Sequence, residues 1–120
     1  MTKVLLVEDD LSQLDLIESY LSESGHTVIC VADAKQALNK AVEHQPDVII
    51  TDVVMPGLSG FELCRSLKKN PATASVPVVI CSSKNQELDR LWGMKQGANA
   101  YLTKPFSREQ LVRAVKAAVI

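Results

Sequence analysis

The sequence contains few cysteines and histidines, the residues that form zinc sites and disulfides. Its three cysteines, Cys30, Cys64 and Cys81, are far apart, form no C-x-x-C motif and do not cluster with either histidine. A zinc site and a disulfide framework are therefore not expected. We predict that all three cysteines are small buried side chains in a reducing compartment.

The sequence also lacks long apolar runs and an excess of either charge. No run reaches the roughly 18 residues of a membrane span, and the first run, at residues 4–7, is too short for a signal peptide. The 13 basic and 14 acidic residues give a net charge of -1, whereas proteins that coat nucleic acid carry a basic excess. We predict a cytoplasmic protein with no membrane or nucleic-acid partner.

No linker, repeat or low-complexity segment divides the 120 residues, of which 47% are hydrophobic. This length and composition suit one compact domain and not two. Short Val, Ile and Leu runs, typical of strands buried on both faces of a parallel sheet, occur at residues 4–7, 28–31, 48–50, 78–81 and, less clearly, 100–102. We predict a single domain over residues 1–120 with five strands.

Between these runs, apolar residues recur at spacings of three and four, which is typical of amphipathic helices that cover a sheet. The predicted inward faces carry Leu14, Ile17 and Leu21, then Ala37, Leu38, Ala41 and Val42, then Phe61, Cys64 and Leu67, then Leu88, Leu91 and Trp92, and last Leu111, Val112, Val115 and Val119. Gly25 and Asn70-Pro71 predict the ends of the first and third helices. Ser107 predicts the start of the fifth.

Five strand–helix repeats predict an α/β domain with a parallel sheet, doubly wound as (βα)5 with helices on both faces. The flavodoxin-like strand order 2-1-3-4-5 fits five strands best. In such a sheet a ligand site forms beyond the carboxyl ends of the strands, where the strand order reverses. The residues that follow the strands are therefore the candidate site.

Charged and hydroxyl side chains stand at these strand ends: Glu8, Asp9 and Asp10 after the first, Thr51 and Asp52 at the third, Ser82 and Ser83 at the fourth, and Thr103 and Lys104 at the fifth. The carboxylates cannot all be ionised side by side without compensation, because like charges repel. Either a cation lies between them or their pKa values are raised. Small carboxylates suit Mg2+ or Mn2+ and leave room for phosphate oxygens.

A carboxylate, a divalent metal, an ammonium and a hydroxyl together form a site for a phosphoryl group. Aspartate is also a known nucleophile toward phosphorus. Asp52 is the candidate, because the residues after it, Val53-Val54-Met55-Pro56-Gly57, begin no helix that it could cap. Asp10 is better explained as the N-cap of the helix that follows it.

These residues resemble the receiver domains of two-component response regulators, over essentially the whole chain. The matching motifs are Glu8-Asp9, Asp52-Val53-Val54-Met55-Pro56-Gly57 with Gly60 after it, Ser82, and Lys104-Pro105-Phe106. A lone Lys-Pro pair would carry no weight, whereas four motifs in this order on the expected elements are specific. Residues 92–98 show a weaker resemblance to stand-alone regulators of motility and phototaxis systems.

The resemblance implies a role for each matching residue in phosphoryl transfer. Asp52 would be the phosphoacceptor, Lys104 would pair with the phosphoryl oxygens, and Ser82 would hydrogen-bond the attached group. Tyr101 occupies the position of an aromatic switch residue, which would move into space that Ser82 vacates. The alternative for Tyr101 is a half-buried aromatic ring with a solvated hydroxyl.

The resemblance also implies a metal site and partners. Mg2+, with Mn2+ as a possible substitute, would be held by Asp9, by Asp52, by the main-chain carbonyl of Val54 and, through water, by Glu8. A histidine kinase would supply the phosphoryl group. The chain would be a stand-alone regulator with no output domain, acting as a monomer or weak homodimer that binds a downstream protein. It would not be an enzyme, since it would lose only its own phosphoryl group.

The chain departs from the chemotaxis-type pattern at two positions. Val54 stands where a polar side chain such as Asn is familiar, and Lys84 stands where an acid is often found. Both positions flank the path of the attacking water. We expect the phosphoryl-group lifetime to differ from that of the fast chemotaxis type, in a direction that the sequence does not give.

The sequence also bears on three other functions. An aspartate-based phosphatase often needs a second Asp two residues after the nucleophile, and that position is Val54. A flavin-binding module needs a phosphate loop after the first strand, where the acidic residues 8–10 would repel a phosphate. A phosphorylation-independent interaction domain remains an open alternative, because an intact site does not prove its use.

Overall fold

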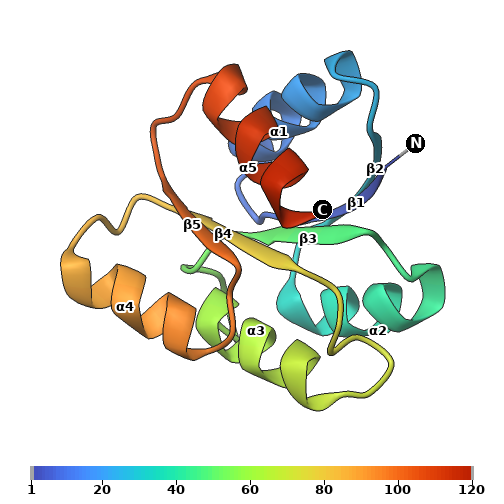
Figure 1. The fold of residues 1–120 in the computed structure, drawn as a ribbon, viewed down its shortest axis with the longest axis vertical. Coiled ribbons are helices and arrows are strands. Elements are labelled where there is room, and N and C mark those ends of the chain that lie inside the picture. Colours follow the sequence, from blue (N-terminus) through green and yellow to red (C-terminus); the bar gives the residue numbers. More distant parts are fainter. Residues whose placement is uncertain (1, 120) are drawn as a thin grey trace.

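The computed structural model describes residues 2–119, in which five strands and five helices alternate along the chain (Figure 1). Their bounds are β1 Lys3–Val7, α1 Leu11–Glu23, β2 Thr27–Val31, α2 Ala34–His44, β3 Val48–Thr51, α3 Gly60–Lys69, β4 Val78–Ser82, α4 Glu87–Lys95, β5 Ala100–Thr103 and α5 Arg108–Ala118. No helix in this part of the chain has the length and apolarity needed to cross a bilayer.

The strands form one parallel sheet in the order β2-β1-β3-β4-β5, which confirms the predicted flavodoxin-like topology. Helices α1 and α5 cover one face, and α2, α3 and α4 cover the other (Figure 1). The three inner strands are almost wholly buried because they are covered on both faces, whereas β2 and β5 at the two edges are partly exposed. The topological switch point, at which the strand order reverses, lies between β1 and β3.

Each face of the sheet carries its own apolar core. Because side chains alternate along a strand, neighbouring residues of β1 contribute to opposite cores. Leu5 packs in the core on the side of α2 and α3, with Leu63 among its members. Leu6 packs in the core on the side of α1 and α5, with Ile17 and Leu111. Together the two cores fix the sheet and therefore the positions of the strand ends.

The helix ends follow the predicted signals. Asp10 caps α1, since its carboxylate accepts hydrogen bonds from the backbone N–H groups of Ser12 and Gln13. Ser107 caps α5 through the N–H of Gln110. Gly25 follows α1 in the left-handed conformation, with φ of 88°. Helix α3 stops at Lys69, directly before Asn70-Pro71.

Three groups of predictions about buried side chains were wrong. Val42 on α2 and Val119 after α5 are exposed and do not belong to the inward faces of their helices. Leu88, Leu91 and Trp92 of α4 do not face the sheet but solvent, and Gly93 is the buried residue of that helix. Cys30 is exposed on the edge strand β2. Cys64 and Cys81 are buried as predicted, and burial raises the pKa of their thiols to about 11 and about 12. The buried thiols are therefore un-ionised at neutral pH.

Candidate functional site

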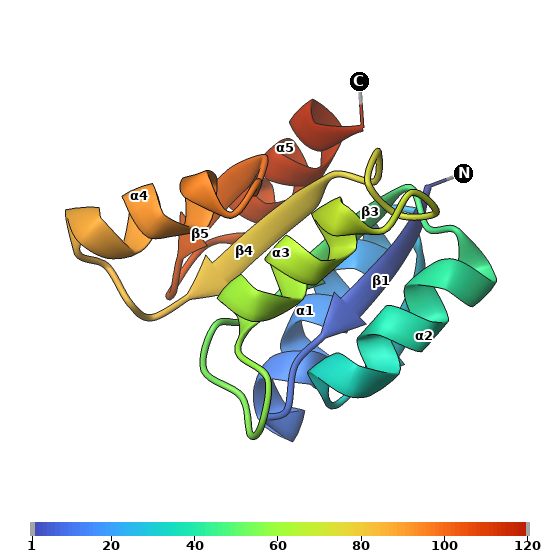
Figure 2. The same cartoon turned by 90° about the horizontal axis from the view of Figure 1, so that it is seen from below.

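The carboxyl ends of the strands open into a cleft of about 540 Å³, on the edge of the sheet toward which the arrows of β1 and β4 point in Figure 2. The cleft is lined by Glu8, Asp9, Asp10, Gln13, Leu16, Asp52, Val54, Ser83, Lys104, Pro105 and Phe106. Residues that follow β1, β3, β4 and β5 thus meet residues of α1 at one place, as the topology predicts.

Three carboxylates gather in this cleft. One oxygen from each of Glu8, Asp9 and Asp52 can be chosen so that all three lie within 4.8 Å of one another. Glu8 is buried, Asp52 is half-buried and Asp9 is exposed. A divalent cation with hard oxygen ligands fits this donor set, because it offsets the repulsion and can retain water on its open side. The residues present therefore suit Mg2+.

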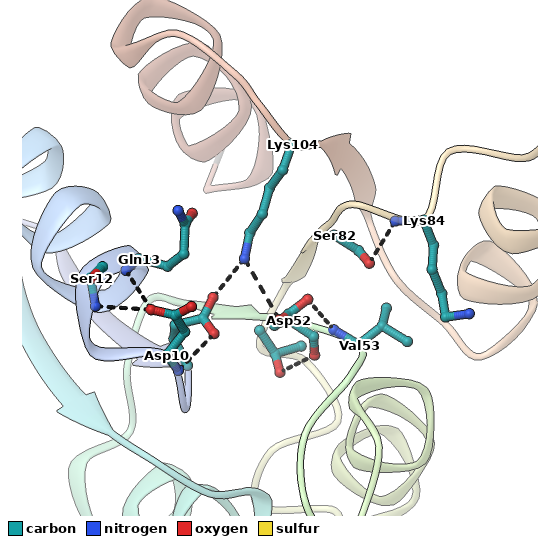
Figure 3. Close-up of polar contacts among 10 residues, drawn as sticks. Asp10, Ser12, Gln13, Asp52, Val53, Ser82, Lys84 and Lys104 are labelled. Atoms are coloured by element: carbon teal, nitrogen blue, oxygen red, sulfur yellow. Dashed lines mark hydrogen bonds and ion pairs between the residues drawn. The ribbon is translucent and has the colours of Figure 1, made fainter.

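The ammonium of Lys104, which follows β5, lies beside two of these carboxylates although it is distant from them in sequence. Its Nζ lies 2.7 Å from Oε1 of Glu8 and 3.6 Å from Oδ2 of Asp52. Figure 3 shows the Lys104 side chain extending toward Asp52. Lys104 and Asp52 therefore share one pocket, as the strand order predicts.

Burial and pairing act on the pKa values of this cluster in opposite directions. Burial raises the pKa of Glu8, although the hydrogen bond from Lys104 lowers it in part. Burial also lowers the pKa of Lys104, but the hydrogen bond to Glu8 and the charge of Asp52 outweigh it and leave that pKa raised. Lys104 therefore carries a full positive charge at neutral pH beside the candidate phosphoacceptor.

The backbone around Asp52 holds its side chain in a defined position. Oδ1 accepts a 2.7 Å hydrogen bond from the N–H of Val53, and the hydroxyl of Thr51 donates to the Asp52 carbonyl at 2.9 Å. The N–H of Asp52 continues the sheet by donating to the carbonyl of Val7. With Oδ1 held by Val53, Oδ2 is the oxygen that faces Lys104.

Gly60 lies against the backbone of Asp52 at the start of α3. Its N–H donates to the carbonyl of Val53 at 2.9 Å, and a Cβ at this position would overlap the carbonyl oxygen of Asp52. The absence of a side chain at residue 60 therefore allows α3 to begin directly beside the site.

Gly60→Ala is expected to destabilise the protein by about 2 kcal/mol or more, because the backbone of Asp52 must move to accept the new atom. Urea unfolding would measure the loss. Gly57→Ala is the control: φ there is 76°, but no atom lies within 4 Å of the added Cβ, so only backbone strain of about 1 kcal/mol is expected. Equal stability of the Gly60 variant and the wild type would contradict the close approach.

Ser82 and Tyr101 are both linked to the backbone of Lys84. The N–H of Lys84 donates to Oγ of Ser82 at 3.1 Å, and the hydroxyl of Tyr101 donates to the Lys84 carbonyl at 2.8 Å. Both side chains are buried, so the Tyr101 ring is already inside in this structure, and its hydroxyl is bonded to the backbone. Ser83, not Ser82, lines the cleft.

The two positions that depart from the chemotaxis-type pattern differ in their relation to the cleft. The side chain of Val54 is exposed and lines the cleft next to Asp52. The side chain of Lys84 points away from Asp52 (Figure 3). Val54 is therefore the one of the two that a reacting water would meet.

Sequence reasoning missed two residues that line the cleft, Gln13 and Leu16, whereas Pro105 and Phe106 belong to the motif that begins at Lys104. Gln13 and Leu16 are three residues apart on α1, and Asp10 lies three residues before Gln13, so helical spacing from the cap could have identified them. It also missed the direct pairing of Lys104 with Glu8, because Glu8 was assigned only to the metal.

Comparisons with known proteins agree with this geometry. The family model of the response regulator receiver domain matches residues 4–116 of the sequence. Protein PilH of Pseudomonas aeruginosa is 38% identical over 117 residues, covering 98% of this chain and 97% of that protein. The chemotaxis protein CheY4 of Vibrio cholerae is 31% identical in its solved structure, with a TM-score of 0.92 and 98% of each chain covered. The receiver domain of the sensor histidine kinase PA1611 from P. aeruginosa PAO1, solved with a magnesium ion coordinated in its active-site cleft, is 31% identical with a TM-score of 0.91, covering 98% of this chain and 97% of that one.

Proposed function

Because the chain belongs to the response regulator receiver domain family, we propose that it accepts a phosphoryl group on Asp52 from a partner histidine kinase. We further propose that the phosphorylated protein acts in the cytoplasm by binding a downstream protein, in chemotaxis or motility signalling. The observation that carries the proposal is the position of Lys104, within 4 Å of both Glu8 and Asp52 in the cleft. The similarity to PilH and to CheY4 supports the signalling role.

In this proposal Oδ2 of Asp52 attacks the phosphorus of a phosphohistidine. A P–O bond forms on Asp52 while the P–N bond breaks, and its electron pair stays on the imidazole. Val53 holds Oδ1, so Oδ2 is kept in the direction of attack. Lys104 offsets the negative charge that develops on the phosphoryl oxygens, which is how a fixed cation stabilises such a transition state.

The proposed metal ligands are Asp9, Asp52 and the main-chain carbonyl of Val54, with Glu8 acting through water. Bound Mg2+ would supply positive charge beside the phosphoryl oxygens. The three carboxylates within 4.8 Å support this assignment, as does the magnesium ion in the receiver domain of PA1611. Lys104 lies closer to Glu8, at 2.7 Å, than to Asp52, at 3.6 Å, which supports Asp9 and Asp52 as direct ligands and Glu8 as a ligand through water.

The proposed switch runs through the backbone of Lys84. A phosphoryl group on Asp52 would draw the Ser82 hydroxyl toward it and away from the Lys84 N–H. Tyr101 is attached to the carbonyl of the same residue, so a shift of Lys84 would alter its hydrogen bond and the start of α4. Phosphorylation need only change a pre-existing balance of two states by a few kcal/mol.

We expect incubation with a small acyl phosphate and Mg2+ to add one phosphoryl group per chain, seen by intact-mass analysis. A chelator in excess should suppress the labelling by at least about 100-fold, because three carboxylates without a cation repel the anionic donor. Restoring Mg2+ in excess of the chelator is the control. The same extent of phosphorylation with and without the chelator would contradict the metal site. No phosphorylation in either case would favour the alternative of a phosphorylation-independent interaction domain.

The phosphoryl-group lifetime is expected to differ from the fast chemotaxis type because of Val54 and Lys84. Val54→Asn should change the decay rate more than Lys84→Glu, since only Val54 lines the cleft. Loss of the added mass with time, after removal of the donor, gives the rates. Decay at the wild-type rate in both variants would remove the idea that these two positions set the lifetime.

A further inference from the structure

Helix α1 begins differently from α3, α4 and α5. In those three helices the side chain of the third helical residue accepts the backbone N–H of the N-cap residue. At α5, for example, Oε1 of Gln110 accepts from the N–H of Ser107 at 2.8 Å. Gln13 holds the same position in α1, but the N–H of its cap, Asp10, donates to Oε2 of Glu8 at 3.2 Å. The carboxamide of Gln13 is therefore not used to cap its own helix.

The carboxamide of Gln13 is instead available in the cleft. The side chain is half-buried, it lines the cleft together with Asp52 and Lys104, and Figure 3 shows it on the α1 side of Lys104. Within the described part of the chain this carboxamide makes no hydrogen bond, and no other described residue that lines the cleft has an amide side chain. The amide can therefore pair with a molecule that enters the cleft, as an acceptor or as a donor.

The other residues on this wall of the cleft are apolar. Leu16 lies one turn after Gln13 on the same face of α1, and Pro105 and Phe106 line the cleft as well. Sites for small organic groups combine apolar walls with a few polar groups that fix the orientation of the bound group. Apolar surface with one neutral hydrogen-bonding side chain suits a flat heterocyclic ring with an N–H group.

We propose that Gln13 recognises the imidazole ring of the phosphohistidine donor, with Oε1 accepting the N–H of the ring nitrogen that does not carry phosphorus. This inference rests on the proposed function, in which Oδ2 of Asp52 displaces that ring. As the P–O bond forms and the P–N bond breaks, the electron pair stays on the released nitrogen while the other nitrogen keeps its proton. The ring thus leaves as neutral imidazole. The hydrogen bond to Gln13 favours the protonated ring that permits this.

A comparison of two small phosphodonors tests this role. The leaving group of acetyl phosphate has no N–H for Oε1 of Gln13 to accept, whereas that of phosphoimidazole has one. Gln13→Met keeps the length of the side chain but lacks the amide. It should lower the ratio of the phosphoimidazole rate to the acetyl phosphate rate about fivefold, the effect of one lost hydrogen bond. Changes in folding, Mg2+ binding or the position of Lys104 act on both rates and cancel in the ratio.

Gln36→Met is the matched control. Gln36 is the third residue of α2, as Gln13 is of α1, and its N–H also donates to a capping aspartate, Asp33, at 2.8 Å. It does not line the cleft, so its variant should give the wild-type ratio of the two rates. Single-turnover phosphorylation in excess Mg2+, followed by intact-mass analysis, would measure both rates for each protein.

A phosphoimidazole methylated on its second ring nitrogen separates the hydrogen bond from packing, because it lacks the N–H. Wild type and Gln13→Met should use this donor at rates within about twofold of each other. If the wild type kept its full advantage with the methylated donor, packing would be the cause and the proposed hydrogen bond would be overturned.

The remaining outcomes separate this proposal from the proposed function. If acetyl phosphate labels the wild type and Gln13→Met has the wild-type ratio of rates, the role of Gln13 is overturned while Asp52 remains the phosphoacceptor. If neither donor labels the wild type, the proposed function itself is overturned, and the role of Gln13 with it.

Discussion

Asp52→Asn is expected to abolish phosphorylation completely. The variant keeps the size of the side chain, and its amide oxygen can still accept the hydrogen bond from Val53, so the position of the side chain is preserved. It lacks the anionic oxygen that attacks phosphorus. Intact-mass analysis after incubation with an acyl phosphate and Mg2+ should therefore show no added phosphoryl group.

The loss of phosphorylation in the Asp52→Asn variant should not come from misfolding. Asp52→Asn removes one of three carboxylates that lie within 4.8 Å of one another, which relieves repulsion. Its midpoint of urea unfolding should be no lower than that of the wild type when a chelator is present. Asp10→Asn is the matched control, because Asn is as good an N-cap as Asp, and it should be labelled normally. A phosphoryl group found on the Asp52→Asn variant would overturn the assignment of the phosphoacceptor.

Lys104→Met is expected to slow phosphorylation about 100-fold, the size of effect seen when one fixed electrostatic group is removed from a transition state. Methionine has a similar length but no charge, so the phosphoryl oxygens lose the cation that faces Oδ2 of Asp52. Single-turnover labelling followed by mass analysis would measure the rate. A rate within threefold of the wild type would show that Lys104 does not act in the transfer.

Lys104→Met should also change how stability depends on pH, because Glu8 then lacks its partner. Burial raises the pKa of Glu8 above its ordinary value of 4.5, and removal of Lys104 raises it further. The folded state then holds the Glu8 proton more tightly than the unfolded state, so stability falls as pH rises from 4.5 through the raised pKa. Below 4.5, Glu8 is protonated in both states and this loss disappears.

Urea unfolding from pH 4 to pH 8, with a chelator present, would follow this effect. Lys104→Arg is the control, since arginine keeps the positive charge beside Glu8 and should flatten the pH dependence. If Lys104→Met lost as much stability at acid pH as at neutral pH, the cause would be lost packing and not an unpaired Glu8 carboxylate.

The inner strands and the strand order were predictable because each strand is a short apolar run and the same strand–helix unit is repeated along the chain. Four consecutive apolar residues at 4–7 are typical of a short strand covered on both faces. The polar residues that follow such strands then meet at one edge of the sheet, which is why Asp52 and Lys104 could be brought together from the sequence. The roles given to them rest on the family resemblance, and phosphorylation of the Asp52 and Lys104 variants tests them.

The errors have a different physical origin. The spacing of Leu88, Leu91 and Trp92 shows that α4 has an apolar side, but it does not show which side meets the sheet. Gly93 decides this, since a helix can lie close to Tyr101 only where it has no side chain. The pairing of Glu8 with Lys104 depends on side-chain reach across the cleft, which element positions alone do not determine.

The hydrogen bond between Lys104 and Glu8 joins residues 96 apart, so the pocket closes only when every residue from Glu8 to Lys104 is present. During synthesis, Asp52 leaves the ribosome long before Lys104 does. A nascent chain that has reached only β4 would already contain Glu8 and Asp52, yet it would lack the ammonium of Lys104 that pairs with them. The pocket is therefore completed only after Lys104 has been synthesised and β5 has joined the sheet.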